Sequence, residues 1–150
     1  MLTPSKQEVS TTSNARAVTH SSLTKDYNTL SQIRTTQQGI PAEEFFSIAQ
    51  QTGISLEKLA SLLEISTRTL NRYRREGKNL SAKESELLIK LTLLMNRGTE
   101  IFGTIEEFID WLSHPAFGLD HQVPFELLYT SEGVNLVADE VERIACGDLA

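Results

Sequence analysis

Residues 55–78 read SLEKLASLLEISTRTLNRYRREGK and contain two short helical patterns joined by a tight connection. The apolar residues of the first pattern recur at the spacing of one helix face and are Leu56, Leu59, Ala60 and Leu63. Ser55 and Ser66 each precede a pattern, where a hydroxyl can accept a hydrogen bond from a free amide of the first turn. Gly77 ends the second pattern, because glycine readily takes the left-handed conformation found at helix ends. The stretch therefore predicts two capped helices around which the chain is organised.

The second helical pattern carries a polar and basic stripe on the side opposite Leu70. Steps of three, four and seven residues place its members together on a helix surface. They are Arg68, Asn71, Arg72 and Arg75. Arginine can pair with guanine or phosphate and asparagine with adenine, so the stripe fits a helix that enters the DNA major groove. Thr67 and Lys78 flank it as expected phosphate contacts, and Ser55 completes the predicted DNA-binding set.

The two patterns resemble the helix-turn-helix of Xre-type bacterial regulators. That motif has a first helix with leucine and alanine, a turn ending in serine, and a recognition helix that bears arginine. Glu64 departs from it, because many such turns carry glycine there and glycine reaches a left-handed conformation more easily. The alternative from the pattern alone is a solvated helical hairpin whose arginines keep it soluble.

Charge is divided unevenly along the 150 residues, whose net charge is −6. Residues 55–78 hold six basic and three acidic residues, whereas residues 101–150 hold ten acidic residues and only Arg143 as a base. A basic patch can meet phosphate while an acidic module avoids nucleic acid and prefers a protein partner. The acidic end could also be no more than a solubilising surface.

The hydrophobic content of 39% is enough for a packed core, in one domain or two very small ones. No apolar run approaches a membrane span, and the first residues lack the apolar region of a secretory signal. The sequence therefore predicts a cytoplasmic protein without a membrane partner. The single Cys146 supports no internal disulfide.

The segments around residues 55–78 predict an all-α fold. Residues 1–35 are polar and are expected to form a mobile tail, although Tyr27, Leu30 and Ile33 are spaced for a short docked helix. Residues 36–98 are expected to form the helix-turn-helix bundle, with one helix starting near Pro41 and another running from Ser81 to about Arg97. The broad apolar surface of the latter predicts contact with the C-terminal module or with a second copy in a homodimer.

Residues 99–150 are expected to form a small helical module. Thr104 should cap one helix and Thr130 the last helix, which Gly147 closes. Between them, a loop with two prolines leads to a turn that should insert its apolar side chains into the core. These side chains are Phe125, Leu127 and Leu128.

The second half resembles the C-terminal domain of Xre antitoxins that partner RES-domain toxins, a domain shared with mycobacterial relatives. The matching features are Trp111-Leu112, Pro115, the loop 119–124, the run Leu127-Leu128-x-Thr130-x-x-Gly133, and Arg143-Ile144-x-x-Gly147. With the Leu80-Ser81-x-x-Glu84-Ser85 start of the linking helix, the resemblance covers about residues 45–150. Both modules occur in the family's order.

The resemblance implies a type II antitoxin that binds a RES toxin, an NAD-degrading enzyme, and represses its own operon through operator DNA. In that family the C-terminal end of the antitoxin lies over the entrance of the toxin's active site. The residues nominated for toxin binding are Glu140, Arg143, Gly147, Asp148, Leu149 and Ala150. The alternatives are a stand-alone transcription factor with a C-terminal dimerisation module and a protein-interaction scaffold without a DNA role.

No motif for catalysis, a cofactor or a metal was recognised, so no enzyme activity is predicted. His114, Asp120, His121 and Cys146 match no common zinc spacing. The carboxylates of Glu106, Glu107 and Asp110 are expected on the solvent side of an amphipathic helix. No glycine-rich phosphate loop or nucleophile motif is present.

Overall fold

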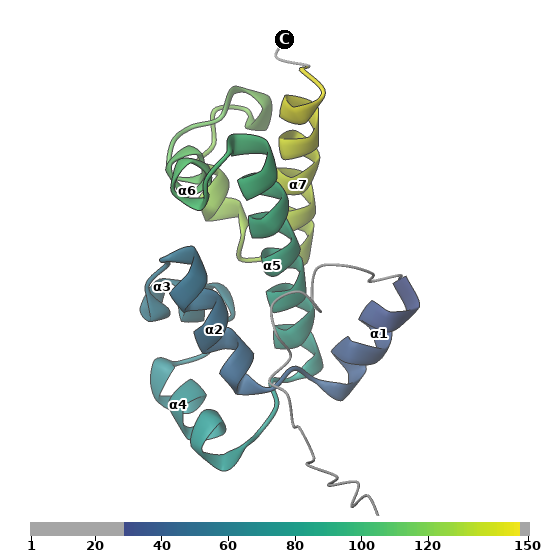
Figure 1. Ribbon diagram of the computed structural model, residues 1–150, viewed down its shortest axis with the longest axis vertical. Helices are drawn as coiled ribbons and strands as arrows, with labels where there is room; N and C mark the ends of the chain where they lie inside the picture. The colour runs from purple at the N-terminus through teal and green to yellow at the C-terminus, as the bar shows by residue number, and fades with distance from the viewer. Residues whose placement is uncertain (1–28, 148–150) are drawn as a thin grey trace, which may run out of the picture.

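The computed structural model describes residues 29–147, and every regular element in that range is a helix (Figure 1). The elements are α1 (Thr29–Gln38), α2 (Ala42–Thr52), α3 (Leu56–Leu62), α4 (Thr67–Glu76), α5 (Ala82–Phe102), α6 (Ile105–Leu112), the 3-10 turns η1 (Phe117–Leu119) and η2 (Pro124–Leu127), and α7 (Ser131–Ala145). This confirms the predicted all-α class, with a helix-turn-helix bundle followed by a small helical module.

The long helix α5 connects the two halves of the molecule. It packs against α1 and α2 near its start and against α6 and α7 further along (Figure 1). Ser81 caps it as predicted, since its hydroxyl accepts from the Glu84 amide while the Glu84 carboxylate accepts from the Ser81 amide. Buried residues therefore occur around much of this helix, which explains its broad apolar surface.

Helix α5 continues beyond the predicted end near Arg97, because Gly98 lies inside the helix. A Cβ atom at Gly98 would collide with the ring of Phe108 on α6. Glycine is therefore present at this position to let α6 approach α5, and the helix ends at Gly103 instead. The predicted domain boundary between residues 98 and 99 falls within one continuous helix.

The core of the first half lies between α2, α3, α4 and the start of α5. Phe45, Leu59, Leu62 and Leu70 have almost no exposed surface. The start of α2 is fastened to α5 by a hydrogen bond of 2.9 Å from the Ile40 amide to the buried Ser85 hydroxyl. As predicted, a third and a fourth helix cover the apolar faces of the helix pair, which cannot bury them alone.

The core of the second half lies between α5, α6, η2 and α7. Phe108, Leu128 and Val137 are fully buried, and Trp111 stacks on Phe108 with ring centroids 5.9 Å apart. Phe125 and Leu128 are buried in the turn before α7, which confirms that this turn inserts into the core. The two halves also meet directly, because the Lys58 ammonium of α3 lies 3.9 Å from the centre of the Phe125 ring.

Residues 29–35, which the sequence assigned to the tail, lie in α1 against α5. The contact uses half-buried polar side chains of α1, whereas Leu30 and Ile33 point to solvent. Local apolar periodicity therefore could not reveal how this helix docks. The rest of the predicted tail, residues 1–28, lies outside the described residues.

Candidate nucleic-acid and partner interfaces

Helix α4 is the candidate DNA-reading element, and local hydrogen bonds set both of its ends. The Ser66 hydroxyl accepts from the Thr69 amide at 3.0 Å, and Gly77 closes the helix in a left-handed conformation. Only Leu70 of this helix is buried, so one side of α4 packs and the rest faces solvent. The predicted pair of capped helices is confirmed.

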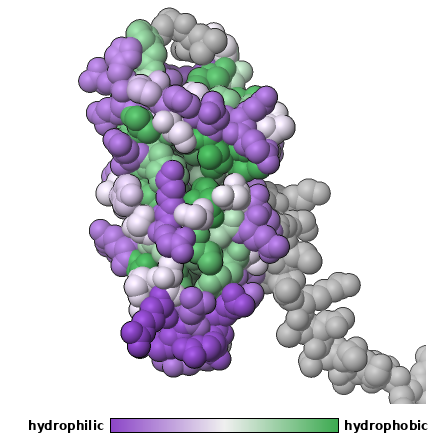
Figure 2. All heavy atoms as spheres, turned by 90° about the vertical axis from the view of Figure 1, so that its left-hand side faces the viewer, coloured by the Kyte–Doolittle hydropathy of each residue, from purple (hydrophilic) through white to green (hydrophobic). Residues whose placement is uncertain are grey.

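The structure brings Arg68, Asn71, Arg72 and Arg75 together on the exposed side of α4. The Asn71 amide nitrogen donates 2.9 Å to the Thr67 carbonyl, which orients that side chain along the helix. In Figure 2 the lower end of the molecule, where α4 lies, is the most hydrophilic part of the face shown. This surface has the charge and donor chemistry that phosphates and base edges require.

The residues flanking the stripe are also used within the fold. Ser55 caps α3 by accepting from the Lys58 amide, and Thr67 is the half-buried first residue of α4. The Lys78 ammonium lies 2.7 Å from the Glu76 carboxylate, and its hydrogen bond lowers the pKa of Glu76. Lys78 remains exposed, so a phosphate can replace this carboxylate as its partner. The DNA-contacting roles of these residues stay predictions.

Arg74 does not belong to the DNA-facing stripe. Its guanidinium lies 4.5 Å from the centre of the Phe46 ring and 3.1 Å from the Glu43 carboxylate. Both partners are on α2, so Arg74 holds α4 against α2 rather than extending toward a ligand. The DNA-binding set predicted from the sequence likewise does not contain Arg74.

The connection between α3 and α4 contains Glu64 in a left-handed conformation with φ of 54°. This is the position where related turns carry glycine, and a side chain there is strained. The Glu64 carboxylate lies 3.2 Å from the Lys83 ammonium at the start of α5, with both side chains largely exposed. An exposed pair adds little stability, so the backbone strain is not offset.

Replacing Glu64 by glycine is expected to stabilise the protein by about 0.5–1 kcal/mol. Glycine removes the cost of a side chain at positive φ, which exceeds the extra freedom that glycine adds to the unfolded chain. The free energy of unfolding in urea measures the gain. Glu64→Ala is the matched control, because it removes the same Lys83 pair but keeps the strain. An equal gain in the alanine variant would contradict the backbone explanation.

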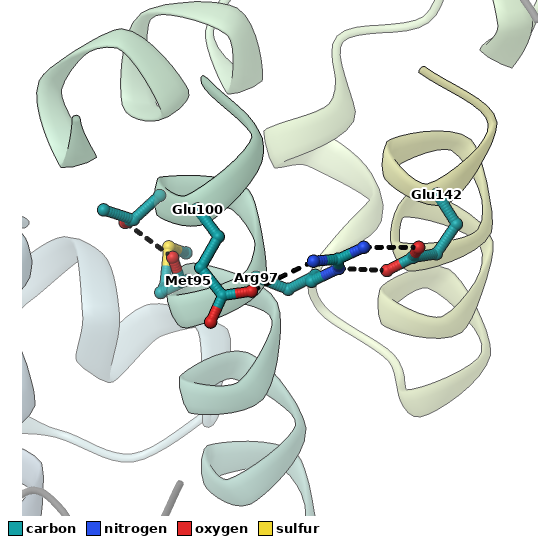
Figure 3. Close-up of polar contacts among 5 residues, drawn as sticks. Met95, Arg97, Glu100 and Glu142 are labelled. Carbon is teal, nitrogen blue, oxygen red and sulfur yellow. Dashed lines mark hydrogen bonds and ion pairs between the residues drawn. The ribbon is translucent and has the colours of Figure 1, made fainter. Parts of the chain in front are cut away.

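The last helix, α7, is fastened to α5 by an exposed charge cluster (Figure 3). The Arg97 guanidinium donates to both oxygens of Glu142 at 2.6 and 3.0 Å, and to Glu100 at 3.0 Å. The hydrogen bonds from Arg97 lower the pKa of Glu142, and the carboxylates raise the pKa of Arg97. The bidentate contact adds a specific link between α7 and α5, which pack together through buried side chains such as Val137.

Two of the residues nominated for toxin binding are engaged with each other. Glu140 is 8% exposed and pairs with Arg143, which also donates 3.4 Å to the Gly118 carbonyl in η1. The Glu140 carboxylate is thus directed into the module, while Arg143 is exposed and connects α7 to η1. Gly147 follows the helix in a left-handed conformation, and Asp148, Leu149 and Ala150 lie outside the described residues.

Sequence reasoning missed the exposed apolar side chains of the C-terminal module. They are Phe117 at 71%, Leu136 at 51% and Tyr129 at 45% exposure. Leu136 could have been noticed, because helical spacing from Val134 and Val137 places it off the buried face of α7. For Phe117, in a short 3-10 turn, no periodicity distinguishes exposure from burial.

Within residues 29–147, no helix is long and apolar enough to cross a membrane. In the same range, no three histidine, cysteine, aspartate or glutamate side chains gather closely enough to hold a metal ion.

Comparison with known proteins assigns both halves of the chain. Residues 31–92 match the antitoxin Xre-like helix-turn-helix domain, and residues 97–147 match the antitoxin Xre/MbcA/ParS C-terminal toxin-binding domain. The chain is also 28% identical over 112 residues to a protein called Antitoxin Xre from Yersinia enterocolitica, covering 74% of this chain and 76% of that protein. Domains of these two kinds bind partners and catalyse no reaction. The chain therefore belongs to the Xre-type antitoxins, with a helix-turn-helix domain and a C-terminal toxin-binding domain.

Proposed function

We propose that the protein is the antitoxin of a type II toxin-antitoxin system and neutralises a RES-domain toxin that degrades NAD. The observation that carries the antitoxin role is the match of residues 97–147 to a toxin-binding domain. The choice of a RES-domain toxin rests on the resemblance of the sequence motifs in the second half to RES-partnered antitoxins. The C-terminal end of α7 lies at the top of the molecule, remote from α4 (Figure 1). A segment that extends from this end can enter the toxin's active site without obstructing α4.

The second part of the proposal is repression of the antitoxin's own operon. A homodimer would present two copies of α4 to two half-sites of operator DNA about one helical turn apart. The exposed arginines of α4 and the net charge of +3 over residues 55–78 support this role, because phosphate attraction dominates DNA affinity. The proposal assigns DNA binding to residues 36–98 and toxin binding to residues 99–150. The predicted tail is shortened, because residues 29–35 belong to α1, which packs against α5.

Co-expression with a RES-domain toxin tests neutralisation. The full chain is expected to restore growth and the cellular NAD level, whereas deletion of residues 147–150 is expected to abolish protection. The deletion begins after the last turn of α7, so the helices described here should still form. Cellular NAD, assayed after induction of the toxin, is the measurement.

A matched variant separates the two activities. Full-length protein with Arg68→Ala and Arg72→Ala should still protect cells, because α4 is remote from the C-terminal end. The truncated protein should in turn still bind operator DNA. Full protection by the truncated protein would reject occlusion by the tail. Failure of the full chain to protect against any RES toxin would favour the stand-alone transcription factor.

A further inference from the structure

Large exposed apolar side chains are concentrated in few places on this protein. Among the described residues they are Leu30 and Ile33 on α1, and Phe117, Tyr129 and Leu136 in the C-terminal module. None belongs to the helices α2 to α6, which form the centre of the fold. Concentration of such side chains in one module indicates a surface that is covered in a complex.

The element that carries Phe117 is packed onto the same helix that carries Leu136. A Cβ atom at Gly118 would collide with both Glu140 and Arg143, so the η1 backbone lies directly on α7. Leu136 precedes Glu140 by four residues and Arg143 by seven, which places the three on one side of the helix. Phe117 and Leu136 therefore lie on adjoining elements, η1 and α7, and we call these two residues the anchor patch.

The anchor patch is held in place before any partner binds. Arg143 bonds to Glu140 and donates to the Gly118 carbonyl, which ties η1 to α7. The Phe117 ring meets the His121 ring edge-on, with centroids 5.4 Å apart, although 71% of the residue stays exposed. Because the η1 backbone that carries Phe117 is held on α7, little backbone freedom is lost when a partner covers this side chain, which favours binding.

The acidic residues around the anchor patch indicate which kind of partner it fits. Glu132 and Asp139 lie one helical turn from Leu136 on the exposed side of α7, and residues 101–150 carry a net charge of −9. A second copy docked through the same patch would bring these carboxylates against each other. A partner with an apolar pocket and basic residues around it fits both the patch and its rim.

We propose that the anchor patch, Phe117 with Leu136, is a main docking point for the toxin, outside the tail that enters its active site. This inference rests on the proposed antitoxin function. Both residues lie within 97–147, the segment that matches the toxin-binding domain, whereas Leu30 lies outside both matched segments. Arg143 and Glu140 act here as positioning residues that hold η1 on α7.

The experiment compares the full-length protein with a variant carrying Phe117→Ser and Leu136→Ser. Affinity for a catalytically inactive RES-domain toxin is measured by calorimetry. The double variant is expected to bind about 30-fold more weakly or worse, since buried apolar anchors contribute most of an interface's affinity. Operator binding and the melting temperature should stay as in the wild type, because both side chains are exposed.

The matched control carries Leu30→Ser and Ile33→Ser, which remove two similarly exposed apolar side chains from α1. It should bind the toxin as the wild type does. Binding of the Phe117 and Leu136 variant within threefold of the wild type would overturn the docking role, while leaving the antitoxin function intact. Lack of toxin binding by the wild type would instead reject the proposed function and this inference with it.

Sedimentation of the antitoxin alone distinguishes the toxin from a second copy as the occupant of the patch. The wild type and the Phe117 and Leu136 variant should have the same oligomeric state. If the variant dissociates into smaller species but still binds the toxin, the patch is a contact between copies and the proposal is wrong.

Discussion

Replacing Arg68 and Arg72 together by alanine is expected to weaken operator binding by about 2–6 kcal/mol. Each arginine that pairs with a base edge contributes about 1–3 kcal/mol. Both side chains are exposed on α4, which buries only Leu70, so their loss should leave the fold unchanged. Titration of labelled operator DNA at several salt concentrations measures the affinity and its salt dependence.

The control for this prediction removes two positive charges elsewhere. Arg34 on α1 and Lys90 on α5 lie outside α4, and their alanine variants lower the net charge by the same amount. If the double arginine variant weakens binding no more than this control, general charge rather than the α4 stripe accounts for the affinity. Lack of measurable operator binding by the wild type would support the scaffold without a DNA role.

Replacing Phe108 by alanine is expected to destabilise the protein by about 3–5 kcal/mol, the usual cost of deleting a buried phenylalanine side chain. Phe108 is fully buried, and its ring lies 5.4 Å from Phe102 and 5.9 Å from Trp111. The residue of α5 that faces the Phe108 ring is Gly98. Because glycine has no side chain, it cannot fill the cavity that the substitution leaves. Denaturant unfolding followed by Trp111 fluorescence is the measurement.

Phe117→Ala is the matched control, because it deletes the same side chain where the residue is 71% exposed. Its free energy of unfolding should change by less than about 0.5 kcal/mol. The two variants therefore distinguish loss of folding stability from loss of a surface contact. Phe108→Ala should impair toxin binding by loosening the fold, and Phe117→Ala should impair it with the fold intact. Similar stability losses in both variants would contradict the burial seen here.

Local patterns in the sequence predicted the helices well, because helix starts depend on neighbours in the chain. Hydroxyl side chains cap α3, α4, α5, α6 and α7 as predicted, each accepting from an amide three residues later. The arginine stripe on α4 likewise follows from helical spacing alone. Glu64 was identified by comparison with turns that carry glycine at this position, and its φ is positive in the structure.

Positions that depend on distant contacts were predicted less well. Gly98 resembles a helix end in the sequence, yet it lies inside α5 because Phe108, ten residues later, occupies the space beside it. Glu140 and Arg143 resemble a free charged surface, yet they pair with each other and hold Gly118, about one-sixth of the chain away. The contact between the Lys58 ammonium and the Phe125 ring, 67 residues later in the chain, likewise has no local signal in the sequence.

The sequence by itself therefore determined the all-α class, the capped helix pair at residues 55–78, its basic stripe and the family of both domains. Capping, periodicity and charge act over three to seven residues, so they can be read without coordinates. Only the tertiary structure decided that α5 is continuous, that Glu140 is buried, and that Phe117 and Leu136 are exposed on adjoining elements. Burial at these positions depends on which helices pack together, and that choice depends on side chains far apart in the chain.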